Sequence, residues 1–277
     1  MIKKISYAFA LSIVSILSCK KNDHISTPVL TNPIVADTRA IMLKNIEAER
    51  LPSPYYHFEY DALHFVKRVS FASDYYVYDV SYKDMRVNKL INIINKDSLD
   101  YQYSDGQVSD IDEFSGRTGK LLFNYHLSYN SSKQLVHVFW YHYPDVGESF
   151  LYKRADLVYQ PDGNLASIDW YYTLSPGPLS WSSRSEFSDY DNKTNTTDIV
   201  LLKENWFFDS YLFLPQVKLQ KNNPKKEHIT SAENEFFISN SYEYQNDLPI
   251  TKYSLVNQTK GENPLPPTQV ATHYNYY

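Results

Sequence analysis

Residues 101–114 read YQYSDGQVSDIDEF, and residues 157–170 read LVYQPDGNLASIDW. Each stretch contains a tyrosine, a short polar turn with Asp-Gly, and then two apolar residues with two others between them. Asp-Gly between alternating apolar residues is a strong hairpin signal, because glycine adopts the positive φ of a tight turn at low cost. Each stretch therefore predicts a β-hairpin whose first strand ends near the tyrosine.

The same pattern recurs along the chain, and internal repetition is a strong guide to architecture. The other copies are residues 58–71, 80–93, 127–140, 188–201 and 242–255. The apolar pairs that follow the turn include Val108/Ile111, Leu135/Val138 and Leu165/Ile168. The copy at 188–201 is weak, because Thr196 stands where an apolar residue is expected.

Two half copies lie at the ends of the repeat array. Leu43 and Ile46 look like the second half of a copy, and Tyr274 and Tyr276 look like a first half. The chain is rich in aromatic residues, with 26 Tyr and 14 Phe, which favour strands. A lone hairpin is marginal in water, so the copies must pair edge to edge. The sequence predicts an all-β fold, an antiparallel meander of about seven hairpins in a large twisted or curled sheet, and leaves open whether the sheet closes.

The first residues, MIKKISYAFALSIVSILSC, have the pattern of a signal peptide. Two lysines precede an apolar run at 5–17 that is too short to span a bilayer, which needs about 20 residues. Leu17-Ser18-Cys19 resembles the lipobox of bacterial lipoproteins. The resemblance implies that residues 1–18 are removed and that lipid on Cys19 tethers the protein to a membrane. Several acyl chains make such a tether stable.

The rest of the chain divides into a tether and one domain. Residues 19–33 carry the lipidated cysteine and a flexible segment with two prolines, and residues 34–277 form a single all-β hairpin-repeat domain. Cys19 is the only cysteine, so the domain has no disulfide. Residues 203–240 interrupt the repeat, and we expect them to form a plug over one end of the sheet, with a binding lid as the alternative.

The repeated hairpin resembles tyrosine-rich YD-type repeats. From about residue 41 to 277 the chain resembles a group of Bacteroidetes-type cell-envelope lipoproteins built from them. The segment LFLPQVKLQKNNPKK at 212–226 is similar to the Asn-Pro segment before the final hairpin in that group. The resemblance implies the fold and an outer-membrane lipoprotein, facing the periplasm or exposed at the surface, but no activity. Asp97-Ser98-Leu99 resembles the O-glycosylation site of that group, with Ser98 as the acceptor.

Motifs for catalysis and metal binding are absent from the sequence. It has no Gly-rich phosphate loop, no G-x-S-x-G, no H-E-x-x-H and no C-x-x-C. We therefore assign no catalytic residue and expect no cofactor and no metal. His126 and His137 fit a surface pair on one hairpin better than a metal site, because no third ligand accompanies them.

The aromatic runs at 139–141 and 170–172 supply the best binding candidates, namely Trp140, Tyr141, Trp170 and Tyr171. Successive side chains of a strand point to opposite faces. In one register Trp140 joins the core and Tyr141 faces out, and a shift by one residue exposes Trp140 instead. Packing within the core is the alternative role for these rings.

The formal net charge of −5 argues against a nucleic-acid partner, which would need a basic face. The sequence favours a membrane-tethered envelope lipoprotein, a non-enzymatic binding or structural module for glycan or protein. The alternative is a glycan hydrolase of the cell envelope, whose two carboxylates can be far apart in the chain. A cleft with two carboxylates within about 10 Å would favour the hydrolase.

Overall fold

The computed structural model describes residues 42–195, 212–215, 217–262, 264 and 266–277. Its regular elements are 16 β-strands within these ranges. The strands are β1 (Leu43–Ala48), β2 (Tyr56–Tyr60), β3 (Val66–Phe71), β4 (Tyr76–Lys83), β5 (Arg86–Asn92), β6 (Ser98–Ser104), β7 (Gln107–Phe114), β8 (Leu121–Tyr129), β9 (Leu135–His142), β10 (Phe150–Tyr159), β11 (Leu165–Tyr172), β12 (Ser180–Thr194), β13 (Asn222–Ser231), β14 (Glu235–Gln245), β15 (Leu248–Lys260) and β16 (Thr268–Tyr276).

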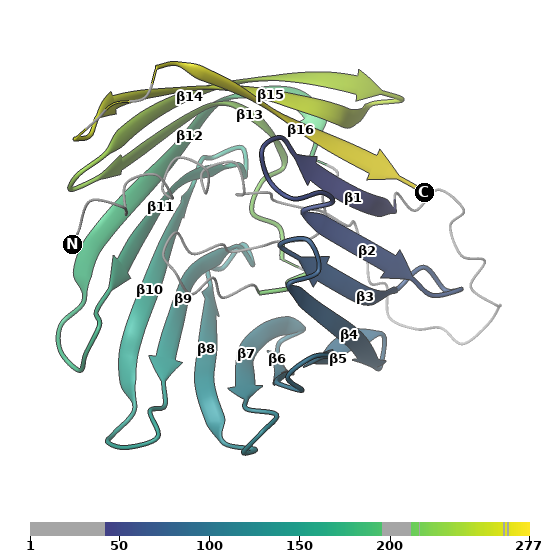
Figure 1. Ribbon diagram of the computed structural model, residues 1–277, viewed down its shortest axis with the longest axis vertical. Coiled ribbons are helices and arrows are strands. Elements are labelled where there is room, and N and C mark those ends of the chain that lie inside the picture. The colour runs from purple at the N-terminus through teal and green to yellow at the C-terminus, as the bar shows by residue number, and fades with distance from the viewer. Residues whose placement is uncertain (1–41, 196–211, 216, 263, 265) are drawn as a thin grey trace.

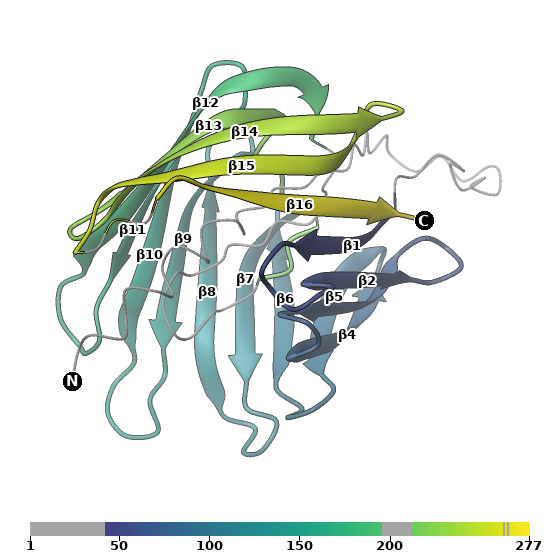
Figure 2. The same ribbon diagram turned by 45° about the horizontal axis from the view of Figure 1, so that its top comes forward.

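The strands follow chain order around one closed antiparallel barrel, as Figures 1 and 2 show. The antiparallel meander is confirmed, but the twisted or curled sheet is a closed barrel. Closure comes from the two half copies, because β1 pairs with β16 and places Ile46 opposite Tyr274. Each half copy supplies the strand that the other lacks, so neither edge of the meander remains unpaired.

Each tight hairpin contains a β-bulge at its tyrosine. In the β6–β7 hairpin, Asp105 and Gly106 have φ values of 50° and 82°, as a type I′ turn requires. Gln102 pairs with Asp110 while Tyr103 pairs with Val108, so Ser109 has no partner residue. This extra residue explains the spacing of three in the repeat, because a bulge lets Val108 and Ile111 both point inward. The register shifts in the same way at Tyr60, Tyr82, Tyr129, Tyr159 and Tyr244.

The repeated tyrosines link each hairpin to the one before it. The Tyr82 hydroxyl donates to the carbonyl of Val66, the residue paired with Tyr60, and Tyr103 donates to Val87, which pairs with Tyr82. The same link joins Tyr129 to Val108, Tyr190 to Leu165, Tyr60 to Leu43 and Tyr276 to Pro249. The last two links flank the seam where β1 pairs with β16: Tyr60 joins β2 to β1, and Tyr276 joins β16 to β15.

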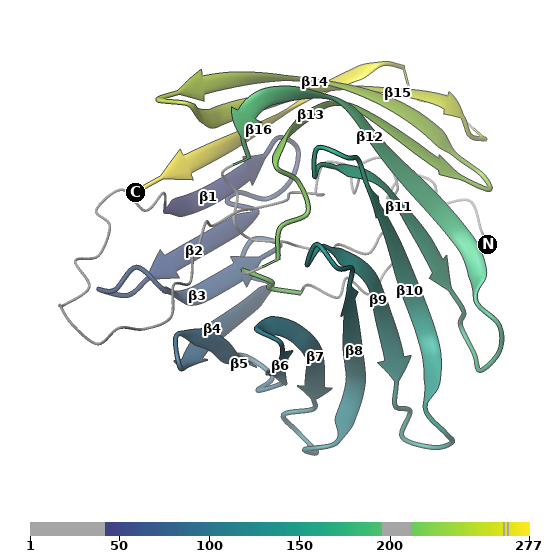
Figure 3. The same cartoon turned by 180° about the vertical axis from the view of Figure 1, so that it is seen from behind.

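The inner wall is mainly apolar, and a segment that precedes β13 packs against it. Leu212, Phe213 and Leu214 are 0% exposed, and the Tyr101 hydroxyl donates to the Phe213 carbonyl over 2.7 Å. Figure 3 shows the green segment before β13 running within the space that the wall encloses. Within the expected interruption at 203–240, residues 222–231 form β13 and 235–240 lie in β14. Residues 203–211 of that range lie outside the described residues.

Candidate functional site

The four aromatic residues expected to form a binding surface lie on opposite faces of the wall. Trp140 and Trp170 point inward and are 1% and 7% exposed, whereas Tyr141 and Tyr171 are half-buried on the outer face. Inside, the Lys153 ammonium lies 5.1 Å from the ring centre of Trp140 and 4.9 Å from that of Trp170. Both tryptophans are therefore part of the interior, in the register that buries Trp140.

The outer face brings together flat side chains from five neighbouring strands, here named the outer row: His126, Phe139, Arg154, Tyr171 and Trp181. Each member lies directly opposite the next across a strand pair. The rings of His126 and Phe139 are 6.2 Å apart, and the Arg154 guanidinium lies 4.3 Å from the centre of the Tyr171 ring. Trp181 is 43% exposed at one end. The outer row is thus a row of flat side chains, four rings and one guanidinium, across β8–β12.

Carboxylates flank the outer row. Asp110 lies 2.9 Å from Nδ1 of His126, Asp156 lies 2.9 Å from the Arg154 guanidinium, and Asp169 accepts from the Trp181 indole over 3.3 Å. A carboxylate has about four acceptor sites, so these contacts leave each of the three able to accept further hydrogen bonds. The strip therefore offers apolar ring faces with hydrogen-bond acceptors beside them.

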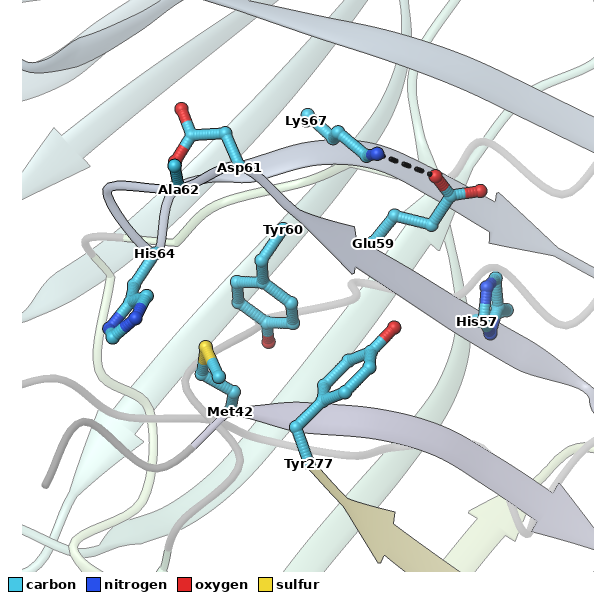
Figure 4. A pocket seen from close by; sticks show the side chains of 9 residues that line it. All are labelled: Met42, His57, Glu59, Tyr60, Asp61, Ala62, His64, Lys67 and Tyr277. Atoms are coloured by element: carbon cyan, nitrogen blue, oxygen red, sulfur yellow. Dashed lines mark ion pairs between the residues drawn. The ribbon is translucent and has the colours of Figure 1, made fainter. Parts of the chain in front are cut away.

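A hollow lies at the seam of the barrel between β1 and β16, next to Tyr277. It has a volume of about 490 Å³, and Figure 4 shows Tyr60 and Tyr277 at its centre and the Lys67–Glu59 ion pair on one side. The rings of Tyr60 and Tyr277 meet edge to face at 5.7 Å. Tyr277 also donates its backbone N–H to the Met42 carbonyl and its hydroxyl to the Phe58 carbonyl. These hydrogen bonds tie Tyr277, which follows β16, to the residue before β1 and to β2.

The two acids of this hollow already have partners in their own hairpin. Glu59 is 3.2 Å from the Lys67 ammonium. Asp61 accepts from the backbone N–H groups of Leu63 and Phe65, which fixes the β2–β3 turn. A glycosidase needs one acid that donates a proton and a second that acts as base or nucleophile. Glu59 and Asp61 serve the hairpin instead, so the hollow offers little support for hydrolysis.

Among the described acids with a resolved shift, Glu113 is the one whose pKa the fold raises. Burial raises the pKa of the Glu113 carboxyl, although the Tyr125 hydroxyl donates to it and acts in the opposite direction. The neighbouring negative charge of Asp97 also raises this pKa. The Asp97 carboxylate itself accepts from Gly116 N–H at 2.7 Å and from the Asn95 amide at 2.6 Å. Because Asp97 holds a loop in this way, we assign no acid–base pair to Glu113.

The remaining sequence candidates are placed as follows. His126 and His137 lie on either side of the Phe139 ring and contact Asp110 and Asp156 respectively. The described residues contain no group of three histidines, cysteines or acids that could hold a metal ion. Ser98 is 8% exposed, so a transferase could reach its hydroxyl only before the domain folds. Cys19 lies outside the described residues.

Three members of the outer row were missed by the sequence analysis, namely Phe139, Arg154 and Trp181. Strand alternation alone places Phe139 on the face opposite to Trp140, so that signal was available. The register of the β9–β10 pair shifts between Leu151 and Lys153, and that of the β11–β12 pair shifts between Trp170 and Tyr171. These two shifts place Arg154 and Trp181 in line with the other members of the row. These shifts cannot be deduced from a single sequence.

Comparison with solved structures shows the same fold in two proteins. A porin-like protein from Bacteroides uniformis superposes with a TM-score of 0.56 at 13% identity, covering 86% of this chain and 95% of that one. A porin-like protein from Bacteroides vulgatus has a TM-score of 0.56 at 14% identity, covering 85% of this chain and 99% of the other. At these identities the likeness concerns the fold alone.

The other comparisons find no relative. No family model matches the chain, and no curated protein matches it. None of the described residues belongs to a helix with the length and apolar character needed to traverse a bilayer.

Proposed function

We propose that this chain is a lipid-tethered accessory protein of the outer membrane, without enzymatic activity, that binds a glycan or protein on its outer wall. In this proposal the barrel stands in water, and lipid on Cys19 supplies the membrane attachment. The signal-peptide pattern and Leu17-Ser18-Cys19 support the tether.

The polarity of the outer wall carries this proposal. On the outside, arginine, lysine or histidine side chains face carboxylates across neighbouring strands, and these side chains are partly exposed. The pairs are Arg68–Asp79, Lys89–Asp100, His126–Asp110, His137–Asp156, Arg184–Asp169 and His228–Glu186. They extend from β3 to β13, so charged groups lie around most of the circumference.

A barrel that spans a bilayer has the opposite arrangement. Its outer face carries an apolar band about 25 Å tall, and its interior is polar. Here the inner wall holds the apolar core, with Leu90, Ile111, Leu135 and Ile168 all 0% exposed. Each Arg or Lys at the middle of a bilayer costs about 2–4 kcal/mol on a barrel surface, and Asp and Glu cost less. This wall is therefore suited to water, and the fold shared with the porin-like structures does not require it to cross the membrane.

β1, the first described strand, lies away from the outer row. The described chain begins at Met42, immediately before β1. Figures 1 and 3 both place β1 and β2 on one side of the barrel and β9–β11 on the other. A ligand on the outer row would thus approach the wall on the side away from β1.

Lipidation is tested by replacing Cys19 with Ala in the full chain and labelling cells with an alkyne fatty acid. The parent should label and the Cys19→Ala variant should not. A variant that labels as well as the parent would contradict the proposal.

A further inference from the structure

We infer that the outer row is a platform for a neutral polysaccharide, which lies across β8–β12 with its sugar rings on the aromatic faces. This inference rests on the proposed binding function and names its site and its ligand class.

The first argument is the shape of the strip. Its five members come from five successive strands, and each lies directly opposite the next. Neighbouring strands are about 4.8 Å apart, so the strip is roughly 19 Å long. Small molecules are usually held in concave pockets that bury most of their surface. An elongated strip on the convex side of a barrel suits a chain molecule that makes many shallow contacts.

The second argument is the chemistry of the strip. Phe139, Tyr171 and Trp181 place aromatic side chains on the outer face, and the Arg154 guanidinium lies over the Tyr171 ring at 4.3 Å. A pyranose has C–H groups on its faces and hydroxyls on its edges. The C–H faces can pack on aromatic rings, and the hydroxyls can donate to carboxylates beside the rings. Asp169 lies within hydrogen-bonding distance of the Trp181 indole, so a ring and an acceptor are side by side there.

The third argument is charge. Arg154 is paired with Asp156 at 2.9 Å, and Arg184 is paired with Asp169 at 3.2 Å. The strip therefore has no free cationic cluster, and the whole chain has a net charge of −5. A polyanion binds chiefly through unpaired Lys and Arg. A neutral polysaccharide does not need unpaired Lys or Arg side chains in order to bind.

The same ion pairs disfavour a flat protein partner. A protein surface laid over them would remove water from Arg154–Asp156 and Arg184–Asp169, and desolvation of such pairs is costly. Polysaccharide hydroxyls replace the hydrogen bonds of that water. Among the two partner classes of the proposed function, the strip therefore favours the glycan.

The test uses the full chain with Cys19→Ser, which removes the lipid from every variant. Affinity electrophoresis is run against soluble starch, laminarin, yeast mannan and xyloglucan, with heparin as a polyanion. We expect at least one neutral polysaccharide to retard the protein and heparin to have no effect. Tyr171→Ala and Trp181→Ala should each weaken binding about tenfold, and the double variant should abolish it.

Phe237→Ala is the matched control. Phe237 is also an outward aromatic residue, 45% exposed, and stacks on His228 at 4.2 Å, but it lies on β14, outside the outer row. The Phe237→Ala variant should bind the polysaccharide as tightly as the parent does. Every variant should show a melting temperature close to the parent's. The inference would be overturned if no neutral polysaccharide retarded the protein, or if only heparin did. It would also be overturned if Phe237→Ala lost as much polysaccharide affinity as the outer-row variants. Lipid labelling of Cys19 is measured separately, so failure here leaves the tether and the general binding role standing.

Discussion

The chain of tyrosine hydroxyls can be tested with two conservative substitutions that should have opposite signs. The Tyr129 hydroxyl donates to the Val108 carbonyl over 2.9 Å. The Tyr159 hydroxyl occupies the same position in the next hairpin, but it is enclosed and has no hydrogen-bond partner among the described residues. Replacing each by Phe removes one oxygen and leaves the ring in place.

The magnitudes follow from this difference. A typical intramolecular hydrogen bond contributes about 0.5–1.5 kcal/mol net, so Tyr129→Phe should lower the free energy of unfolding by about 1 kcal/mol. An enclosed hydroxyl without a partner costs roughly 1–3 kcal/mol of desolvation, so Tyr159→Phe should raise that free energy by about 1 kcal/mol. The two variants should therefore differ by about 2 kcal/mol.

The assay is urea unfolding of the Cys19→Ser chain, followed by tryptophan fluorescence and by circular dichroism. With a denaturant slope of about 3 kcal/mol per M, the urea midpoints of the two Phe variants should differ by roughly 0.7 M. The parent midpoint should lie between them. If both variants are destabilised equally, the hydroxyl links do not distinguish the two positions, and this account of the repeated tyrosine fails.

Other predictions use the two faces of the wall and the buried phenols. Trp140→Ala should lower the free energy of unfolding by about 3–5 kcal/mol because Trp140 is 1% exposed, whereas the neighbouring outward Tyr141→Ala should cost about 1 kcal/mol or less; equal urea midpoints would refute this placement. Burial raises the pKa of Tyr103 to about 12, above its ordinary value near 10, so the folded state keeps a proton that the unfolded state releases between these values. Stability should be retained below about pH 10 and fall as the pH rises towards 12. Tyr103→Phe should reduce that fall in urea midpoints measured across pH, and an unchanged pH profile would contradict the assignment.

The hairpins were predictable because their signals are local. Asp105-Gly106 supplies its own turn, and the apolar residues on either side supply the core face, so short windows of sequence were sufficient. The half copies at Leu43 and Tyr276 could also be seen, but their pairing joins residues more than two hundred positions apart. Nothing local distinguishes a meander with two free edges from one whose edges meet.

The copy at 188–201 shows where local reasoning ends. It was weak in sequence, and the structure shows residues 188–194 within the long strand β12. Pro224, which belongs to the expected interruption, lies in β13 and pairs with Tyr190 of β12. A strand of this kind is stabilised by its neighbours rather than by its own turn, so the periodicity of one segment does not reveal it.

The sequence by itself determined the repeating unit: a tyrosine, a turn, and apolar residues three apart, because turn chemistry and side-chain alternation act over a few residues. Only the tertiary structure decided that the sheet closes, that Trp140 and Trp170 face inward, and that Phe139, Arg154, Tyr171 and Trp181 form one outward strip. The physical reason is register. One bulge moves every later side chain of a strand to the opposite face, and its position depends on pairing with another strand.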